Sequence, residues 1–298
     1  MSVRGEVHPT SVTWPLEIRG RLRDYALLAK VRLSAMVLLS ALVGYWLAST
    51  DIVVVHVLWF AVGTFLVVGG ANALNQVLER ETDALMRRTA NRPLPSSRLS
   101  VAEATAVASL MSLAGVSILF FVNGPLCATL ALTALLIYVL VYTPMKSRSR
   151  WSTVPGAIAG AIPPLMGWSA AEGSLGALAW SVFGIVFLWQ FPHTWAIAAT
   201  YREDYKKAGY RAWPARGTRL RTIGASLLLV FASILPVVMG FAGSLYLGGA
   251  VILGAALVFV SVRFGEGAIR GRATALLAAT LFYLPLVLAL LALDGKGV

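Results

Sequence analysis

Nine long apolar segments follow one another along this chain, separated by polar loops, and they restrict its fold more than any other feature. Most are close to the ~20 residues that an α-helix needs to cross a bilayer. Hydrophobic residues make up 58% of the chain and charged residues only 13%, a composition typical of membrane proteins. The expected fold is an all-α, multi-pass membrane protein with spans at about 31–49, 53–75, 100–122, 125–143, 154–171, 176–199, 221–241, 245–263 and 273–293.

The basic residues indicate how these spans are oriented. If the N-terminus is cytoplasmic, 24 of the 25 Lys and Arg residues fall in segments on that side, at 1–32, 76–99, 146–150, 200–221 and 263–272. Because Lys and Arg concentrate on the cytoplasmic side, we expect a cell (inner) membrane protein with a cytoplasmic N-terminus and polar loops, and an outside C-terminus. The net charge of +12 therefore belongs to membrane-flanking loops, and no nucleic-acid partner is expected.

Neither a long linker nor a low-complexity segment divides the chain. Residues 1–27 are polar and rich in arginine, unlike a cleavable signal peptide, and we interpret them as a cytoplasmic tail with a short helix near 14–25. Residues 28–298 are expected to form one intramembrane domain. The single cysteine, Cys127, lies in an apolar segment and is expected to serve packing. The glycines and prolines of 154–171 fit either close helix packing or a broken helix that lines a cavity.

A polar stripe lies where the second apolar segment ends. Asn72, Asn75, Glu79 and Asp83 recur at helical spacing and share one face. Two carboxylates and amide oxygens suit Mg²⁺, which completes its shell with water and phosphate oxygens. Four arginines follow within the same segment, at Arg80, Arg87, Arg88 and Arg92. The stripe thus predicts a diphosphate site, the alternative being a solvated helix end with ordinary ion pairs.

A second polar stripe lies at the corresponding end of the sixth apolar segment. One helical face carries Gln190, His193, Thr200, Asp204 and Lys207, and Glu203 lies about a quarter turn away. Intramembrane ionisable groups usually mark a functional site. The short loop 142–151 adds Lys146, Arg148 and Arg150, which could neutralise phosphate or simply anchor the loop at the membrane surface.

The pattern Asn75-x-x-x-Glu79-x-x-x-Asp83 followed by RTANRPLP resembles the UbiA superfamily of intramembrane prenyltransferases, from about residue 25 onward. That resemblance implies nine transmembrane helices around a central cavity and two Mg²⁺-dependent, diphosphate-binding motifs. Glu79 in place of an aspartate, the segment WQFPHTWAIAATYREDYKKAGY and the segment YTPMKSRSRW resemble one branch of the superfamily. The activity implied is transfer of farnesyl from farnesyl diphosphate to a vinyl group of protoheme IX, which gives heme O.

The resemblance also implies roles for individual residues. The expected catalytic residues are Asn75, Glu79, Asp83, His193 and Asp204. Metal ligands are expected at Glu79, Asp83, Glu203 and Asp204. Diphosphate-binding residues are expected at Arg80, Arg87, Arg88, Arg92, Lys146, Arg202 and Lys207. Heme, a substrate here, is expected to contact His193, Asn72 and Gln190.

Mg²⁺ is the cofactor that the resemblance implies, and the partners are farnesyl diphosphate, protoheme IX, the lipid bilayer and heme A synthase. His193, Thr194 and Tyr201 stand near positions where quinone-pathway relatives carry aspartates, so the number of metal ions stays open. His193 could ligate the heme iron, bond to a propionate or guide a water molecule.

Other functions are compatible with parts of the sequence. Another prenyl acceptor, such as a quinone precursor or a chlorophyll-type ring, would use the same diphosphate site. An ion-coupled transporter also carries intramembrane acids, but normally near the midplane, whereas these acids lie at one face. A structural membrane subunit would not need both polar stripes.

Overall fold

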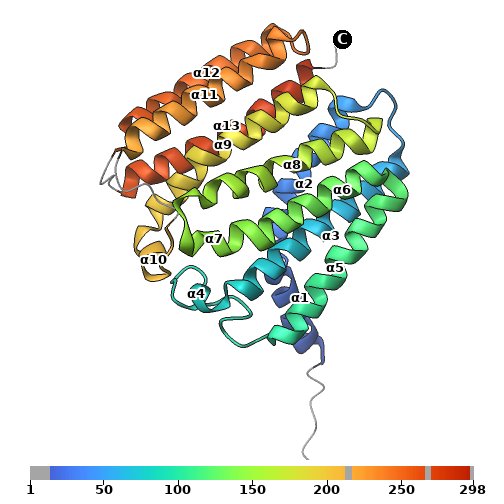
Figure 1. The fold of residues 1–298 in the computed structure, drawn as a ribbon, viewed down its shortest axis with the longest axis vertical. Helices are drawn as coiled ribbons and strands as arrows, with labels where there is room; N and C mark the ends of the chain where they lie inside the picture. The colour runs from blue at the N-terminus through green and yellow to red at the C-terminus, as the bar shows by residue number, and fades with distance from the viewer. Residues whose placement is uncertain (1–13, 212–216, 266–269, 296–298) are drawn as a thin grey trace, which may run out of the picture.

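The computed structural model describes residues 14–211, 217–265 and 270–295 as a bundle of slanted helices, with no strand in these ranges (Figure 1). The helices are α1 (Trp14–Leu28), α2 (Val31–Ala48), α3 (Val54–Leu78), α4 (Arg80–Ala84), α5 (Val101–Asn123), α6 (Pro125–Leu136), η1 (Ile137–Tyr142), α7 (Thr143–Arg148), η2 (Arg150–Ser152), α8 (Thr153–Glu172), α9 (Ala177–Thr200), α10 (Arg202–Lys207), α11 (Thr218–Val238), α12 (Ser244–Arg263) and α13 (Arg270–Asp294).

The expected all-α, multi-pass architecture is confirmed. In the described ranges, eight helical segments are long and apolar enough to cross a membrane, and α6, η1 and α7 together form one of them. The remaining expected span is α8, which is 20 residues long but rich in glycine, proline and other small residues. Most of α8 is buried among other helices, so it presents little surface to lipid and needs less apolar character.

Three apolar clusters form the core, and α8 contributes to two of them. One joins α8 and α9 to α11, α12 and α13, and the other joins α8 to α2, α3 and α6. The crossing of α2 and α8 is especially close, because Gly44 of α2 lies against the backbone of Pro164, and Gly167 lies against that of Ala41. Of the two interpretations of span 154–171, close packing through small residues therefore holds along this face.

The ends of the spans are set by recognisable local signals. Ser100 caps α5 by accepting a 3.1 Å hydrogen bond from the Glu103 backbone N–H. At its other end, Gly124 has a φ of 93° and Pro125 starts α6, which gives the short turn between two antiparallel helices. Cys127, near the start of α6, is buried and unpaired, as expected for a packing residue.

Each polar stripe was expected on one helical face, and in the structure a break interrupts the helix within each stripe. The α3 helix ends at Leu78, and Glu79, with φ −97° and ψ 8°, separates it from α4. Likewise Tyr201 separates α9 from α10. The helical hydrogen bonding continues across the first break, since the Asp83 N–H donates to the Glu79 carbonyl at 2.7 Å. The spacing therefore still brings Glu79 and Asp83 one turn apart.

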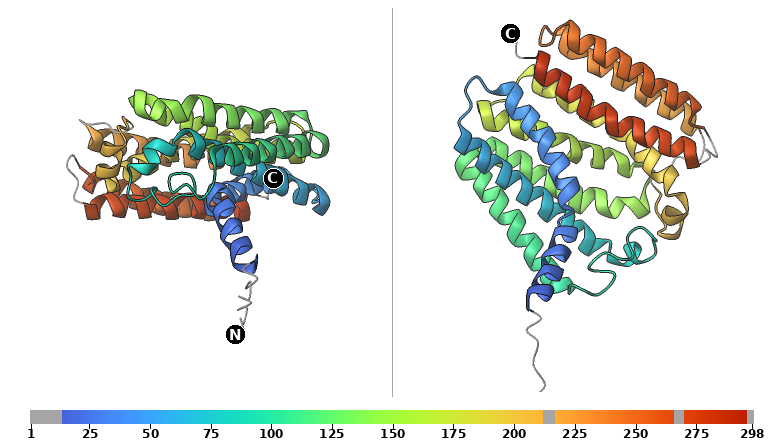
Figure 2. Two further views of the ribbon diagram at one scale, coloured as in Figure 1. Left: turned by 90° about the horizontal axis from the view of Figure 1, so that it is seen from below. Right: turned by 180° about the vertical axis from the view of Figure 1, so that it is seen from behind.

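The short helices α4, α7 and α10 gather at one end of the bundle, where the two polar stripes lie (Figure 1). At this end α1 extends away from the other helices (Figure 2). The expected helix at 14–25 is thus present as α1, whereas residues 1–13 of the expected tail lie outside the described ranges. The division into a tail and one domain, and which end faces the cytoplasm, stay predictions.

Candidate active site

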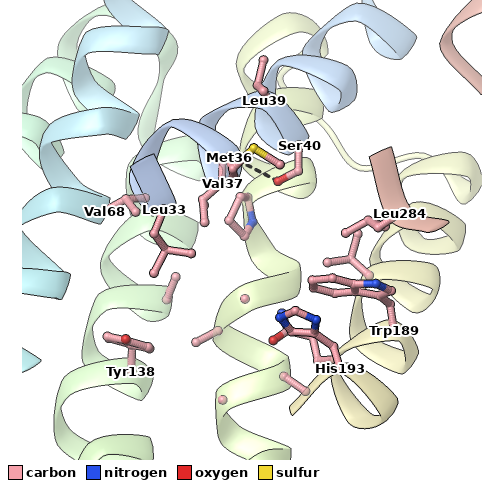
Figure 3. A pocket seen from close by; sticks show the side chains of 18 of the residues that line it. Leu33, Met36, Val37, Leu39, Ser40, Val68, Tyr138, Trp189, His193 and Leu284 are labelled. Atoms are coloured by element: carbon pink, nitrogen blue, oxygen red, sulfur yellow. Dashed lines mark hydrogen bonds between the residues drawn. The ribbon is translucent and has the colours of Figure 1, made fainter. Parts of the chain in front are cut away.

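A cavity of about 530 Å³ lies within the bundle and is lined by side chains of α2, α3, α6, η1, α8, α9 and α13. Its walls are largely apolar, and the polar side chains among them are few. Figure 3 shows Trp189 and His193 side by side on one wall, with Leu33 and Tyr138 on the other. All three residues expected to contact heme line this cavity, namely Asn72, Gln190 and His193. An apolar pocket with a few convergent polar groups is the usual form of a small-molecule site.

Two glycines of α8 let side chains that line the cavity pack against the helix backbone. A Cβ added to Gly156 would lie 2.8 Å from the Tyr142 ring, and one added to Gly160 would meet the Gln190 amide. Tyr142 and Gln190 therefore pack directly on the α8 backbone. The expected alternative of a broken helix is wrong, because α8 is continuous from Thr153 to Glu172, but its small residues do form part of the cavity wall.

At the α4 end of the bundle lies a buried carboxylate. Asp83 is only 1% exposed, and its Oδ2 accepts a 2.6 Å bond from the Arg92 guanidinium. Its other oxygen, Oδ1, is buried and has no hydrogen-bond partner among the described residues. A buried, unpartnered carboxylate oxygen is costly, so Asp83 Oδ1 is a candidate ligand atom for a cation.

Glu79 forms a second buried ion pair, with Lys146 of α7 at 2.8 Å. Burial disfavours its carboxylate, but the adjacent Lys146 ammonium outweighs burial, and the pKa of Glu79 lies below its ordinary value. Lys146 also lies over the Tyr142 ring, 4.5 Å from its centroid. Because Tyr142 lines the cavity, it connects the cavity to the charged end of the site.

Lys30 and Asn75 connect α2 and α3 to this cluster. Lys30 has left-handed backbone angles (φ 47°, ψ 52°) between α1 and α2, and its ammonium donates to Asn75 Oδ1 at 2.9 Å. The Asn75 amide donates to Thr143 Oγ1 at 3.0 Å. Burial, followed by the nearby cations Arg92 and Lys146, lowers the pKa of Lys30 to about 7.

The π-helix η1 carries Tyr138 and Tyr142, which line the cavity, and Lys146 follows four residues after Tyr142. The Thr143 N–H donates to the Tyr138 carbonyl, five residues earlier, and its hydroxyl donates to the same carbonyl at 2.8 Å. Pro144 follows at once and has no N–H to continue the α-helical pattern. Such π-helical turns within α-helices occur frequently at functional sites.

Loops from both polar stripes meet at the same end of the bundle. The Arg87 backbone N–H donates to Asp204 Oδ1 at 3.4 Å, and the Arg88 guanidinium lies 5.0 Å from the centroid of the Tyr201 ring. Thr82 Oγ1 and the Tyr210 hydroxyl are 3.2 Å apart. The segment after α9 therefore covers the segment after α3, as one shared site requires.

Some expected site residues are not brought together. Arg80 pairs with the exposed Glu81, and Arg202, Glu203 and Lys207 are exposed on α10. Within the described ranges, no group of three or more His, Cys, Asp or Glu side chains is close enough together to hold a metal ion. The four expected metal ligands thus do not form one protein-only cage, because Glu79 and Asp83 are ion-paired instead.

Three residues of this cluster carry no distinctive signal in the sequence. Lys30 precedes an apolar segment, as membrane-anchoring lysines generally do. Thr143 and Tyr210 are neutral residues whose role appears only when the helices pack. The left-handed conformation of Lys30, uncommon for a non-glycine residue, is the structural feature that directs its side chain to Asn75.

Residues 37–286 match the UbiA prenyltransferase family. The chain belongs to this family of membrane prenyltransferases. Its relatives include protoheme IX farnesyltransferases from Solibacter usitatus, 39% identical over 93% of this chain and 100% of the relative, and from Opitutus terrae, 40% identical over 92% and 95%. A third, from Anaeromyxobacter dehalogenans, is 44% identical over 79% of this chain and 81% of the relative. Within the family, the chain thus falls in the protoheme IX farnesyltransferase group.

Solved structures with the same fold are more distant in sequence. A digeranylgeranylglyceryl phosphate synthase has a TM-score of 0.77 at 18% identity and covers 94% of this chain and 100% of its own. A UbiA homologue from Archaeoglobus fulgidus, bound to GPP and Mg²⁺, has a TM-score of 0.67 at 16% identity and covers 90% of this chain and 99% of its own. These likenesses establish the fold.

Proposed function

We propose that this protein transfers a farnesyl group from farnesyl diphosphate to a vinyl group of protoheme IX, giving heme O. One observation supports this most directly: Tyr142 lines the apolar cavity and also contacts Lys146, which pairs with Glu79. A substrate with a long apolar chain and a charged head fits a cavity that ends in such a cluster. The protoheme IX farnesyltransferases among the relatives support the choice of both substrates.

The diphosphate would lie among the cations at the α4 end. Lys146 and Arg92 are the partly buried candidates, while Arg87 and Arg88 lie on the loop that meets Asp204 and Tyr201. As the allylic C–O bond breaks, its electron pair leaves with the diphosphate. Fixed positive charges stabilise that developing charge, and removing one such group typically costs about 3–4 kcal/mol in the activation barrier. The exposed Arg80, Arg202 and Lys207 are weaker candidates.

The residues present fit one Mg²⁺ ion that arrives with diphosphate. Glu79 and Asp83 supply carboxylates one turn apart, and the unpartnered Asp83 Oδ1 is a ready ligand oxygen. Asp204 is the candidate from the second stripe, and the exposed Glu203 is a poorer one. When bound, Mg²⁺ would neutralise diphosphate charge and so favour its departure.

The farnesyl cation that remains after diphosphate leaves must react with the acceptor before it reacts with water. The apolar walls of the cavity, including Leu33 and Met36, would exclude bulk water from it. The vinyl electron pair forms the new C–C bond. One water molecule then adds to the adjacent carbon and loses a proton, which leaves a hydroxyethylfarnesyl group. Asn72, Gln190 and His193 are the polar groups that would face the porphyrin.

Purified protein incubated with heme, farnesyl diphosphate and Mg²⁺ is expected to give heme O, identified by the mass of the porphyrin product. Quinone-precursor and chlorophyll-type acceptors serve as competitors in the same assay. Preferential prenylation of either would assign a different acceptor. Ion flux in liposomes without diphosphate release would contradict the prenyltransferase proposal.

The same proposal extends to the cellular setting. The active-site loops and N-terminus would lie in the cytoplasm and the C-terminus outside the cell (inner) membrane, in keeping with the distribution of Lys and Arg. The product would then pass to heme A synthase, which the family resemblance implies as a partner.

Binding of inorganic pyrophosphate is expected to weaken as the pH rises above about 7, by up to about tenfold per pH unit. Above that pH Lys30 is neutral in the free protein, and binding an anion must restore its proton. The measurement is the Kd of pyrophosphate by isothermal titration calorimetry from about pH 7 to about pH 9. Lys30→Met should remove the part of the pH dependence of the Kd that comes from Lys30. Pyrophosphate itself also titrates in this range, but its contribution is the same for both proteins and cancels when they are compared. Equal slopes in both proteins would contradict the role of Lys30.

A further inference from the structure

His193 and Trp189 are both held by Thr280 of α13. The His193 Nδ1 lies 3.0 Å from Thr280 Oγ1, and the Trp189 indole N–H donates to the Thr280 carbonyl at 2.7 Å. The two rings stack with centroids 4.3 Å apart and planes inclined by 19°. Thr280 is fully buried, so water does not compete for these contacts. The orientation of the His193 ring is therefore fixed from α13.

The hydroxyl of Thr280 has a single proton, and that proton is already used. Thr280 Oγ1 donates to the Leu277 carbonyl of its own helix at 2.7 Å. Both contacts can be hydrogen bonds at once only if His193 Nδ1 carries a proton and donates it to Thr280 Oγ1. In the neutral imidazole, Nε2 is then left with a free lone pair. An imidazole nitrogen in this state accepts a proton or binds a metal, but it cannot donate to a carboxylate.

We infer that Thr280 is a positioning residue that fixes His193 as the Nδ1–H tautomer, so that Nε2 binds the iron of the heme substrate in the cavity. This inference rests on the proposed function, because it takes heme as the acceptor. Metal-binding histidines generally donate their other ring N–H to a fixed acceptor, which sets the tautomer and the ring orientation. Of the three roles open for His193, donation to a propionate would require the imidazolium, because the neutral Nδ1–H tautomer has no proton on Nε2.

The test is binding of ferric heme to the intact purified protein, followed by the Soret band and by electron paramagnetic resonance. The wild type should show nitrogen ligation of the iron, and His193→Ala should lose it. Thr280→Val keeps the shape of the side chain but removes the acceptor, and should weaken heme binding by about tenfold with altered iron ligation. Thr280→Ser restores the hydroxyl and should restore both.

Thr222 provides a matched control. It is fully buried in α11, and its hydroxyl bonds to the Thr218 carbonyl in its own helix. Thr222→Val should leave the heme spectrum unchanged. A Thr280→Val protein with wild-type spectrum and affinity would overturn the inference. So would a wild type that makes heme O without nitrogen ligation. A wild type that neither binds heme nor prenylates it would instead contradict the proposed function.

Discussion

Replacing Asp83 with asparagine is expected to reduce product formation by roughly a thousandfold while the protein still inserts and purifies. Asp83 is almost fully buried, pairs with Arg92 through one oxygen and leaves the other unpartnered. Asparagine keeps the size but removes the charge that would hold the metal-loaded diphosphate. The measurement is the turnover rate with saturating heme and farnesyl diphosphate. Glu79→Gln should behave in the same way.

Two further variants separate chemistry from folding. Arg92→Gln breaks the same ion pair from its other side, and loss of a buried pair can cost about 3–5 kcal/mol of stability. If Asp83→Asn acted only through folding, both variants would share a lowered thermal midpoint and keep their turnover number. Glu81→Gln, at an exposed neighbouring carboxylate, should change neither property. Turnover of Asp83→Asn within about tenfold of the wild type would contradict a metal-binding role, since removal of one stabilising group typically costs more.

Adding a single methyl group at Gly167 is expected to cost about 3 kcal/mol of stability, near the upper end for overpacking. The new Cβ would lie closer than 3.0 Å to the backbone of Ala41 and Tyr45, and backbone atoms cannot move aside as a flexible side chain can. The helices α2 and α8 would have to separate. Both helices line the cavity, so turnover should fall as well. Thermal unfolding of the detergent-solubilised protein measures the effect.

Gly184 of α9 is the control for this variant. A Cβ there meets nothing within 4 Å, and Gly184→Ala should match the wild type or exceed it slightly because alanine favours the helix. Equal thermal midpoints for Gly167→Ala and Gly184→Ala would show that the α2–α8 crossing tolerates separation. That outcome would contradict the close packing described for this helix pair.

The transmembrane architecture could be predicted because each span must be long and apolar independently of its neighbours. The boundaries of α2, α3, α5 and α9 accordingly lie within a few residues of those expected. The breaks at Glu79 and Tyr201 could not be predicted, because helical spacing continues across them in the sequence. The same holds for η1, since its π-helical turn depends on Thr143 and Pro144 acting together.

The candidate site was predictable where charge stands out against an apolar background, as at Glu79, Asp83 and His193. It was not predictable which cation would neutralise which carboxylate, because Lys146 lies on a separate helix and Arg92 in the following loop. Thr280 gave no signal at all. A threonine within an apolar segment ordinarily satisfies its own helix, and only packing of α13 against α9 brings it to His193.

Glu79 and Asp83 are each paired with a cation, and these two ion pairs have a consequence for metal selectivity. With Lys146 on Glu79 and Arg92 on Asp83, the resting protein presents little unbalanced negative charge to a lone divalent ion. A lone calcium or manganese ion would have to displace the Lys146 ammonium or the Arg92 guanidinium, with no anion to compensate for the displaced charge. A metal ion that enters bound to diphosphate brings with it an anion, to which Lys146 and Arg92 can then bind. The two ion pairs would therefore disfavour binding of a metal ion that arrives without diphosphate.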